Sequence, residues 1–271
     1  MGHYYDRDGN ACHMQATKPG AKNKTRPTTV TDARKQGLLP SVTTVLDVIS
    51  KPFLTEWQIK EALKVAYARP AFGGENEDEW IAFVREKANQ QVGMAADLGT
   101  NVHKAIEMAL NTQEWAQELK SYVLPTLDVV RNMGIKEQVS ESITVNSEIG
   151  YAGCVDLAGW VIDTEGLADV MPLTVPVIVD FKTKKTKAGE KIDISETYPW
   201  QLAAYHVSKF GKGQRELQLL AKAALVFISS TEPGRVETVW FDRAQLSHAW
   251  ECFKTCHKLW CLRNKFSLTS S

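Results

Sequence analysis

Two stretches decide the fold: Tyr151-Ala-Gly-Cys-Val-Asp-Leu-Ala-Gly-Trp-Val-Ile-Asp163 and Val175-Pro-Val-Ile-Val-Asp-Phe-Lys182. The second is rich in β-branched residues, as suits a strand that is buried on both faces. Side chains alternate along a strand, so Asp180 and Lys182 project to one face and Phe181 to the other. Asp156 lies mid-strand in the first stretch. It comes beside Asp180 and Lys182 if the two strands pair.

Two carboxylates and an ammonium group at one strand end can together bind a divalent metal ion and a phosphate. Hard oxygen ligands from one or two carboxylates hold Mg²⁺ or Mn²⁺, and the ion takes its remaining ligands from water and a phosphate substrate. A neighbouring lysine can orient the water or neutralise developing charge. The alternative is that Asp180 and Lys182 form an ordinary surface ion pair at a strand end.

Four short motifs follow one another along the chain. They are Gly99-Thr-Asn-Val-His103-Lys-Ala-Ile-Glu107, Gly153-Cys-Val-Asp156, Asp180-Phe-Lys182-Thr and Gln201-Leu-Ala-Ala-Tyr205. Their order resembles that of the PD-(D/E)XK nuclease superfamily, in its RecB-like exonuclease branch. The series is also similar to mitochondrial genome maintenance exonucleases, phage exonucleases and CRISPR-associated RecB-like nucleases. Four motifs in one order, over roughly Leu39 to Phe241, are more specific than any one of them.

The resemblance implies roles for the motif residues at a metal-dependent catalytic centre. Asp156 and Asp180 would bind the metal together with the carbonyl of Phe181, and Lys182 would be the catalytic lysine. His103 would reach the metal, especially Mn²⁺, which accepts imidazole more readily than Mg²⁺ does. The alternative for His103 is that it packs between helices as a core histidine.

Further residues would support the centre or contact DNA. Glu107 lies one helical turn after His103 and could bind a metal-held water or a second metal. The set that would support the site or contact DNA is Gln201, Tyr205, Lys184, Lys185, Ser41 and Thr43; the resemblance implies this role for Gln201, Tyr205 and the helix that begins at Ser41. Gln201 and Tyr205 share one helix face at a spacing of four. Their alternatives are core packing for Tyr205 and solvent exposure for Glu107 and the two lysines.

Composition indicates an ordinary globular chain of 271 residues with zero formal net charge. The charge balance counts mildly against DNA binding but does not exclude a basic groove. No apolar run reaches the length of a membrane span, and we see neither a signal peptide nor a clear transit peptide. We therefore expect a soluble intracellular protein with no membrane partner, in the cytoplasm of a bacterium or a phage-infected cell.

The five cysteines do not suggest a disulfide framework, because their number is odd and their spacing irregular. Some RecB-like nucleases hold an iron–sulfur cluster with one cysteine ahead of the core and three after it. Cys252, Cys256 and Cys261 could supply the later three, but the early segment near Pro52 has no cysteine. We favour core packing over an iron–sulfur cluster.

The predicted fold is α/β, a central mixed sheet flanked by helices, with a helical region before it. We expect a flexible arm over residues 1–38, a single domain over 39–266, and a fraying tail over 267–271. The domain divides into a helical part, 39–133, and a part with the sheet and the last helix, 134–266. Expected helices cover residues 57–68, 77–91, 93–110 (one helix, or a kinked pair joined at Gly99), 112–133, 199–210 and 242–265. Expected strands cover 136–147, 151–163, 175–182, 221–230 and 235–241, and the charged connection 184–198 should be mobile.

The expected function is a Mg²⁺- or Mn²⁺-dependent DNA exonuclease that acts on strand ends, with single-stranded DNA favoured, in recombination, repair or replication. The alternative is a non-cleaving module on the same fold that binds nucleic acid or a protein. A small-molecule hydrolase finds no support, because no nucleophile elbow is present. A single-strand-annealing or replication protein is the kind of partner that the resemblance suggests. Cleavage polarity, DNA or RNA preference and oligomeric state stay open.

Overall fold

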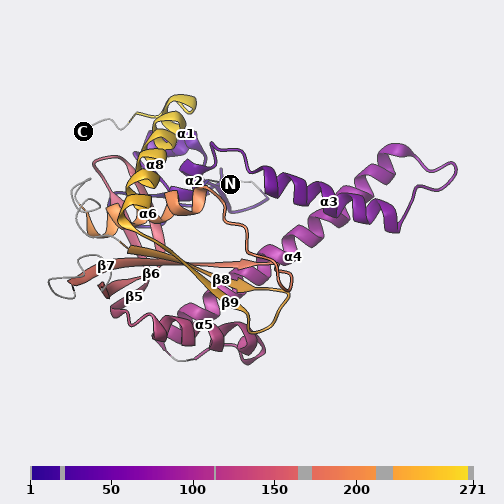
Figure 1. The fold of residues 1–271 in the computed structure, drawn as a ribbon. Helices are drawn as coiled ribbons and strands as arrows, with labels where there is room; N and C mark the ends of the chain where they lie inside the picture. The colour runs from indigo at the N-terminus through magenta and orange to yellow at the C-terminus, as the bar shows by residue number, and fades with distance from the viewer. Residues whose placement is uncertain (1, 19–21, 113, 164–172, 212–221, 268–271) are drawn as a thin grey trace.

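The computed structural model describes residues 2–18, 22–112, 114–163, 173–211 and 222–267. At its centre is a five-stranded mixed sheet in the order β5-β6-β7-β8-β9 (Figure 1). The strands are β5 (Lys136–Asn146), β6 (Tyr151–Asp163), β7 (Leu173–Lys184), β8 (Lys222–Ser229) and β9 (Val236–Phe241). β7 and β8 are parallel and the other neighbours antiparallel. The α/β class with a mixed sheet is therefore confirmed.

Helices cover both faces of the sheet. The shorter helices are α2 (Val42–Leu46), α5 (Lys120–Asn132) and α6 (Thr197–Phe210), and the long ones are α4 (Glu77–Asn111) and α8 (Arg243–Arg263). One core joins α2, α6 and α8 to the sheet, and a second core joins α4 and α5 to its other face. α6 lies between the parallel strands β7 and β8 in the chain, so the end of β7 and the start of α6 lie at one edge of the sheet.

The strands follow the predicted pattern closely. β5 and β6 form the expected antiparallel hairpin, and Gly150 turns the chain between them with φ of 94°. Most of the segment between the predicted strands 151–163 and 175–182 lies outside the described part of the chain, as does most of the predicted tail. β7 is longer than predicted because its pairing with β8 continues to Lys184, two residues past Lys182.

The prediction of a flexible arm over residues 1–38 is wrong for the part that the structure describes. β1 (Tyr4–Tyr5) pairs with β4 (Leu39–Pro40), and β2 (Met14–Ala16) pairs with β3 (Thr25–Pro27). α1 (Val30–Gln36) begins with a capping box between Thr29 and Asp32. Tyr4 is buried in the main core, so this segment is part of the folded domain.

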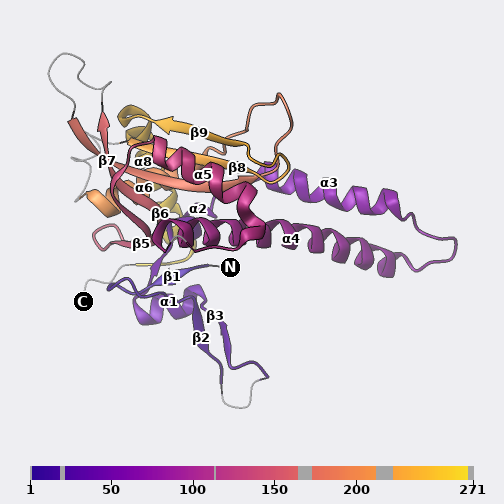
Figure 2. The same ribbon diagram turned by 90° about the horizontal axis from the view of Figure 1, so that it is seen from below.

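The predicted helices before the sheet also need correction. The segments 77–91 and 93–110 form one unbroken helix, α4, since an isolated glycine weakens a helix by only about 1 kcal/mol without ending it. α3 (Pro52–Ala68) begins earlier than predicted, at a proline in its first turn. The single predicted helix 112–133 is instead a short 3₁₀ turn, η1 (Gln117–Leu119), followed by α5. α3 and α4 form a hairpin that projects from the body (Figure 2).

Within the described ranges, none of the helices has the combination of length and apolar character that crossing a bilayer takes.

Candidate active site

The candidate site opens where β6 and β7 stop pairing. The ladder between them ends at Leu157 opposite Val179, although both strands continue. Beyond this pair, the backbone N–H of Phe181 donates to Oδ2 of Asp156 at 2.8 Å. The side chain of Asp156 therefore takes a backbone partner on β7 and lies beside the segment that carries Asp180 and Lys182.

Asp180 is held on two sides. Its Oδ1 accepts a hydrogen bond of 3.0 Å from Nε2 of Gln201, and its Oδ2 pairs with Nζ of Lys182. Asp180 is only 2% exposed, and the Lys182 side chain is 21% exposed. The pair is therefore mostly buried, unlike the ordinary surface ion pair that was the alternative interpretation.

The two carboxylates and the lysine influence one another electrostatically. Burial, and then the charge of Asp180, raise the pKa of Asp156 well above its ordinary value. Burial opposes the charge on Lys182, but Asp180 and Asp156 outweigh burial and raise the Lys182 pKa. The site therefore keeps a protonated lysine at neutral pH beside a carboxylate whose charge is destabilised.

His103 reaches the site from α4. Its Nδ1 lies 3.6 Å from Oδ2 of Asp156, and its ring meets that of Phe181 edge-on at 6.3 Å between centroids. Burial, and then the charge of Lys182, lower the pKa of His103, so the imidazole is neutral at neutral pH. The contact with Asp156 is then not an ion pair. A neutral imidazole is the form that can bind a metal ion.

Gln201 and Tyr205 form the support behind Asp180. Nε2 of Gln201 also lies 3.2 Å from the hydroxyl oxygen of Tyr205, and both residues are buried. A Cβ atom added at Gly153 would lie 2.6 Å from Cε1 of Tyr205, so the ring packs directly on the backbone of β6. Gly153 therefore admits the Tyr205 ring that lies beside Gln201.

An open cleft of about 600 Å³ lies beside these residues, between α4 and the strand ends. It is lined by Ala95, Ala96, Gly99, Thr100, His103, Lys104, Glu107, Glu141, Lys182 and Thr183. Three residues of the predicted set therefore line the cleft: His103, Glu107 and Lys182.

Glu141 is a lining residue that sequence reasoning missed. It lies in β5, and its Oε2 accepts a hydrogen bond of 3.0 Å from Sγ of Cys154. Burial raises the pKa of Glu141. Its φ of 47° is unusual for a residue other than glycine, and such strain recurs at functional sites. In the sequence, Glu141 looks like any polar residue of an alternating strand, so nothing there indicates that it lines a cleft.

The four remaining predicted contacts lie around the site. Nζ of Lys184 donates to the carbonyl of Asp193 in the same connection, whereas Lys185 is exposed with its ammonium 5.6 Å from the ring centroid of Trp57. Ser41 caps α2 by accepting from the N–H of Thr44 at 3.0 Å, and its backbone bridges to Ala152 next to Gly153. Thr43 is exposed, and its hydroxyl lies 3.0 Å from that of Ser41.

The donor set fits Mg²⁺ or Mn²⁺ in its chemistry. Asp156 and Asp180 are close enough for one charge to raise the pKa of the other, and a divalent cation would relieve this repulsion. Among the residues that the structure describes, no three His, Cys, Asp or Glu side chains are grouped as a ready metal site. Mg²⁺ is commonly held by one or two carboxylates, water and substrate phosphate, so it does not require such a group.

No protein-family model matches the sequence, and no curated protein does. Among solved structures, the chain is similar to one described as "Crystal structure of SSO0001". The identity is 15% and the TM-score 0.30, over 74% of this chain and 86% of that chain. A likeness of this size carries no argument about chemistry, which has to be inferred from the geometry of the site.

Proposed function

We propose that the chain is a divalent-metal-dependent DNA exonuclease with the core of the PD-(D/E)XK superfamily. The observation that carries the proposal is the convergence of Asp156, Asp180 and Lys182 at the end of β7, next to a cleft that His103 also lines. These residues come from three separate motifs and two sides of the sheet. Their convergence is what phosphodiester hydrolysis at a metal centre would require.

Asp156, Asp180, the Phe181 carbonyl and the neutral imidazole of His103 would hold Mg²⁺ or Mn²⁺. The chemistry that the ion supplies when bound is polarisation of a phosphoryl oxygen and acidification of a water molecule. The protein supplies the geometry. Gln201 holds one oxygen of Asp180 at 3.0 Å, and the Phe181 N–H holds one oxygen of Asp156 at 2.8 Å, so each carboxylate is oriented by a second group.

Lys182 supplies the positive charge for catalysis. Its raised pKa keeps the ammonium protonated throughout the neutral range. A protonated lysine can donate to a phosphate oxygen as negative charge develops there, and such electrostatic stabilisation is worth a few kcal/mol, or about a hundredfold or more in rate. Binding substrate would require the ammonium to exchange part of its contact with Asp180 for the phosphate.

Action on strand ends is supported by the cleft. α4 forms one side of it, with the small residues Ala95, Ala96 and Gly99 and the polar Thr100. Small side chains leave room for a narrow strand between the helix and the ends of the sheet. The support pair Gln201 and Tyr205 and the histidine on α4 favour an exonuclease over a restriction endonuclease by family resemblance.

The test is digestion of linear and circular single-stranded DNA of one sequence, with Mn²⁺ and with EDTA. An exonuclease should release nucleotides from the linear DNA in a metal-dependent way. The circular DNA, which has no ends, should stay intact. Oligonucleotides blocked at the 5′ or the 3′ end then give the polarity. Binding to linear DNA with no cleavage in Mn²⁺ or Mg²⁺ would instead favour the alternative, a non-cleaving module on the same fold.

A further inference from the structure

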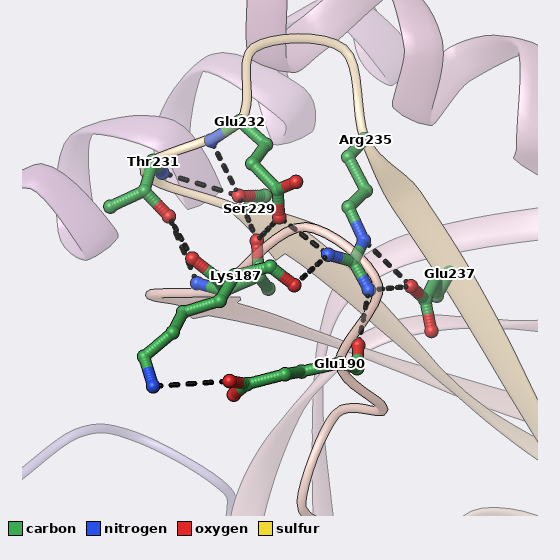
Figure 3. A network of polar contacts seen from close by, with 8 residues as sticks. Lys187, Glu190, Ser229, Thr231, Glu232, Arg235 and Glu237 are labelled. Carbon is green, nitrogen blue, oxygen red and sulfur yellow. Dashed lines mark hydrogen bonds and ion pairs between the residues drawn. The ribbon is translucent and has the colours of Figure 1, made fainter.

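The connection between β7 and α6, which we expected to be mobile, is anchored by Arg235 (Figure 3). The Arg235 guanidinium donates to the carbonyl of Lys187 at 2.9 Å and to that of Glu190 at 2.8 Å. It also donates to the carboxylates of Glu232 and Glu237. One side chain from the turn between β8 and β9 therefore binds two backbone carbonyls of the connection.

A second group of contacts holds the start of the connection. The N–H of Thr186 donates to Oγ1 of Thr231 at 2.9 Å, and the same hydroxyl donates back to the Thr186 carbonyl at 2.7 Å. The hydroxyl of Thr186 lies 2.6 Å from that of Ser229 and also contacts Glu232. Glu232 thus links the Thr186 contacts to those of Arg235.

Lys185 lies between two fixed points. On one side, the Lys184 carbonyl accepts from the N–H of Ser230 at 2.9 Å, which extends the pairing of β7 with β8. On the other side, Thr186 is held by Thr231. The Lys185 side chain is exposed, with its ammonium over Trp57 of α3. Its backbone is thus held by hydrogen bonds on both sides while its charge faces solvent, three residues after Lys182.

We propose that Arg235 is a positioning residue that holds Lys185 in place as a contact for a DNA phosphate. This inference rests on the proposed function, since it takes the substrate to be DNA. The charge of Arg235 is already matched by Glu232 and Glu237, so Arg235 serves the connection, whereas Lys185 presents an exposed ammonium beside Trp57. The ladder with β8 holds Lys182 separately, opposite Phe227, so loss of Arg235 should weaken binding and leave the catalytic step intact.

Arginine is required for this role because its donors form a planar fork. The fork reaches two carbonyls and two carboxylates at once, whereas a lysine ammonium is a single point of charge. Arg235→Lys should therefore release the connection almost as fully as Arg235→Ala does, although the charge is kept.

The first test measures whether the connection opens, with a lysine-specific protease that ignores arginine. Arg235→Ala, Arg235→Lys and Thr186→Val should each be cleaved after Lys187 faster than the wild type. Arg131→Ala is the matched control, because Arg131 is exposed and pairs with Asp128 one turn away. Circular dichroism and melting temperature show whether each variant is folded. Resistance of Lys187 in the folded Arg235 variants would overturn the proposal.

The second test measures the affinity for a fluorescent single-stranded oligonucleotide in EDTA, which prevents cleavage. One lost phosphate contact should weaken binding about fivefold at ~0.1 M salt and reduce the salt slope by about 0.7. Lys185→Ala and Arg235→Ala should each give this loss, and the double variant should be no weaker than either single one. Arg131→Ala, which removes the same charge elsewhere, should bind as the wild type does.

Additive losses, or wild-type affinity in Arg235→Ala, would show that Arg235 does not act through Lys185. Failure of the wild type to bind the oligonucleotide would also overturn the inference. Failure of the proposed function looks different. The wild type would bind the oligonucleotide and the double variant would bind no more weakly than either single variant, but no nucleotides would be released in Mn²⁺ or Mg²⁺.

Discussion

At the scale of single residues, the chemistry depends on two carboxylates that are held close together with little solvent. Burial and the charge of Asp180 raise the pKa of Asp156, so a charged Asp156 destabilises the folded protein at neutral pH. Proteins retain such strain where function requires it. A bound divalent cation would neutralise the repulsion between Asp156 and Asp180, so the two charged carboxylates would then stabilise the folded protein.

This arrangement predicts opposite effects of Asp156→Asn on stability and on metal binding. Asparagine keeps the shape and can still accept from the Phe181 N–H, but removes the repulsion with Asp180. The melting temperature in EDTA should therefore rise, while Mn²⁺ affinity measured by calorimetry should fall strongly. Asp180→Asn should also lose Mn²⁺ affinity, because a hard cation requires the charge.

Asp128→Asn is the control for both variants, since Asp128 is an exposed acid on α5 that pairs with Arg131. Its melting temperature and Mn²⁺ affinity should match those of the wild type. Undiminished Mn²⁺ affinity in both Asp156→Asn and Asp180→Asn would remove these two acids from the metal site.

At the scale of elements, the contact between α6 and β6 positions the support residues. Tyr205 packs its ring on the backbone of Gly153, and Gln201 on the same helix face holds Asp180. A side chain at position 153 would push α6 away from the sheet. The spacing between this helix and this strand is therefore part of the site.

Gly153→Ala should destabilise the protein by about 1 to 3 kcal/mol, the usual cost of overpacking a filled core. Activity should fall as well, because Gln201 moves with α6. Gly93→Ala is the matched control: nothing lies within 4 Å of a Cβ there, and alanine in place of glycine in helix α4 should stabilise by about 1 kcal/mol. Urea denaturation of both variants checks the prediction, and a neutral Gly153→Ala would contradict the packing.

α6 also carries a buried histidine that makes stability depend on pH. Burial lowers the pKa of His206 from its ordinary 6.5 to about 4. The unfolded chain then binds a proton more readily than the folded protein does. The stability contribution is therefore complete above pH 6.5 and decreases as pH falls toward 4, by about 3 kcal/mol in total.

His206→Gln removes this titration, so its unfolding free energy should vary less between pH 7 and pH 4 than that of the wild type. The exposed His248→Gln is the control and should keep the wild-type slope. Parallel pH profiles of His206→Gln and the wild type would show that His206 is not protonated preferentially in the unfolded chain.

At the scale of the whole molecule, the sheet could be predicted from the sequence. β-Branched runs and the turn at Gly150 carry their own signals, and β6 was predicted with its observed bounds. The motif order also predicted which acids and which lysine come together. These signals are local, and period-two alternation converts them directly into a shared face.

The contacts that depend on distant partners could not be predicted. Tyr4 and Tyr5 look like isolated aromatics in a polar arm, and their pairing with β4 appears only in the folded chain. Arg235 resembles any charged turn residue, because its bonds to the Lys187 and Glu190 carbonyls leave no pattern in the sequence. Glu141 lines the cleft with a backbone φ of 47°, and this angle cannot be predicted from a glutamate in the sequence.

Single-turnover cleavage of linear single-stranded DNA by Lys182→Ala in Mn²⁺ tests whether this site is the catalytic centre. Lys182 lines the cleft but also pairs with the buried Asp180, so circular dichroism has to show that the variant is folded before its rate is compared. The cleavage rate should fall by about a hundredfold or more. Lys254→Ala, which removes a charge on α8 that pairs with Glu251, should cleave at the wild-type rate. Cleavage by folded Lys182→Ala at the wild-type rate would contradict the assignment of this site as the catalytic centre.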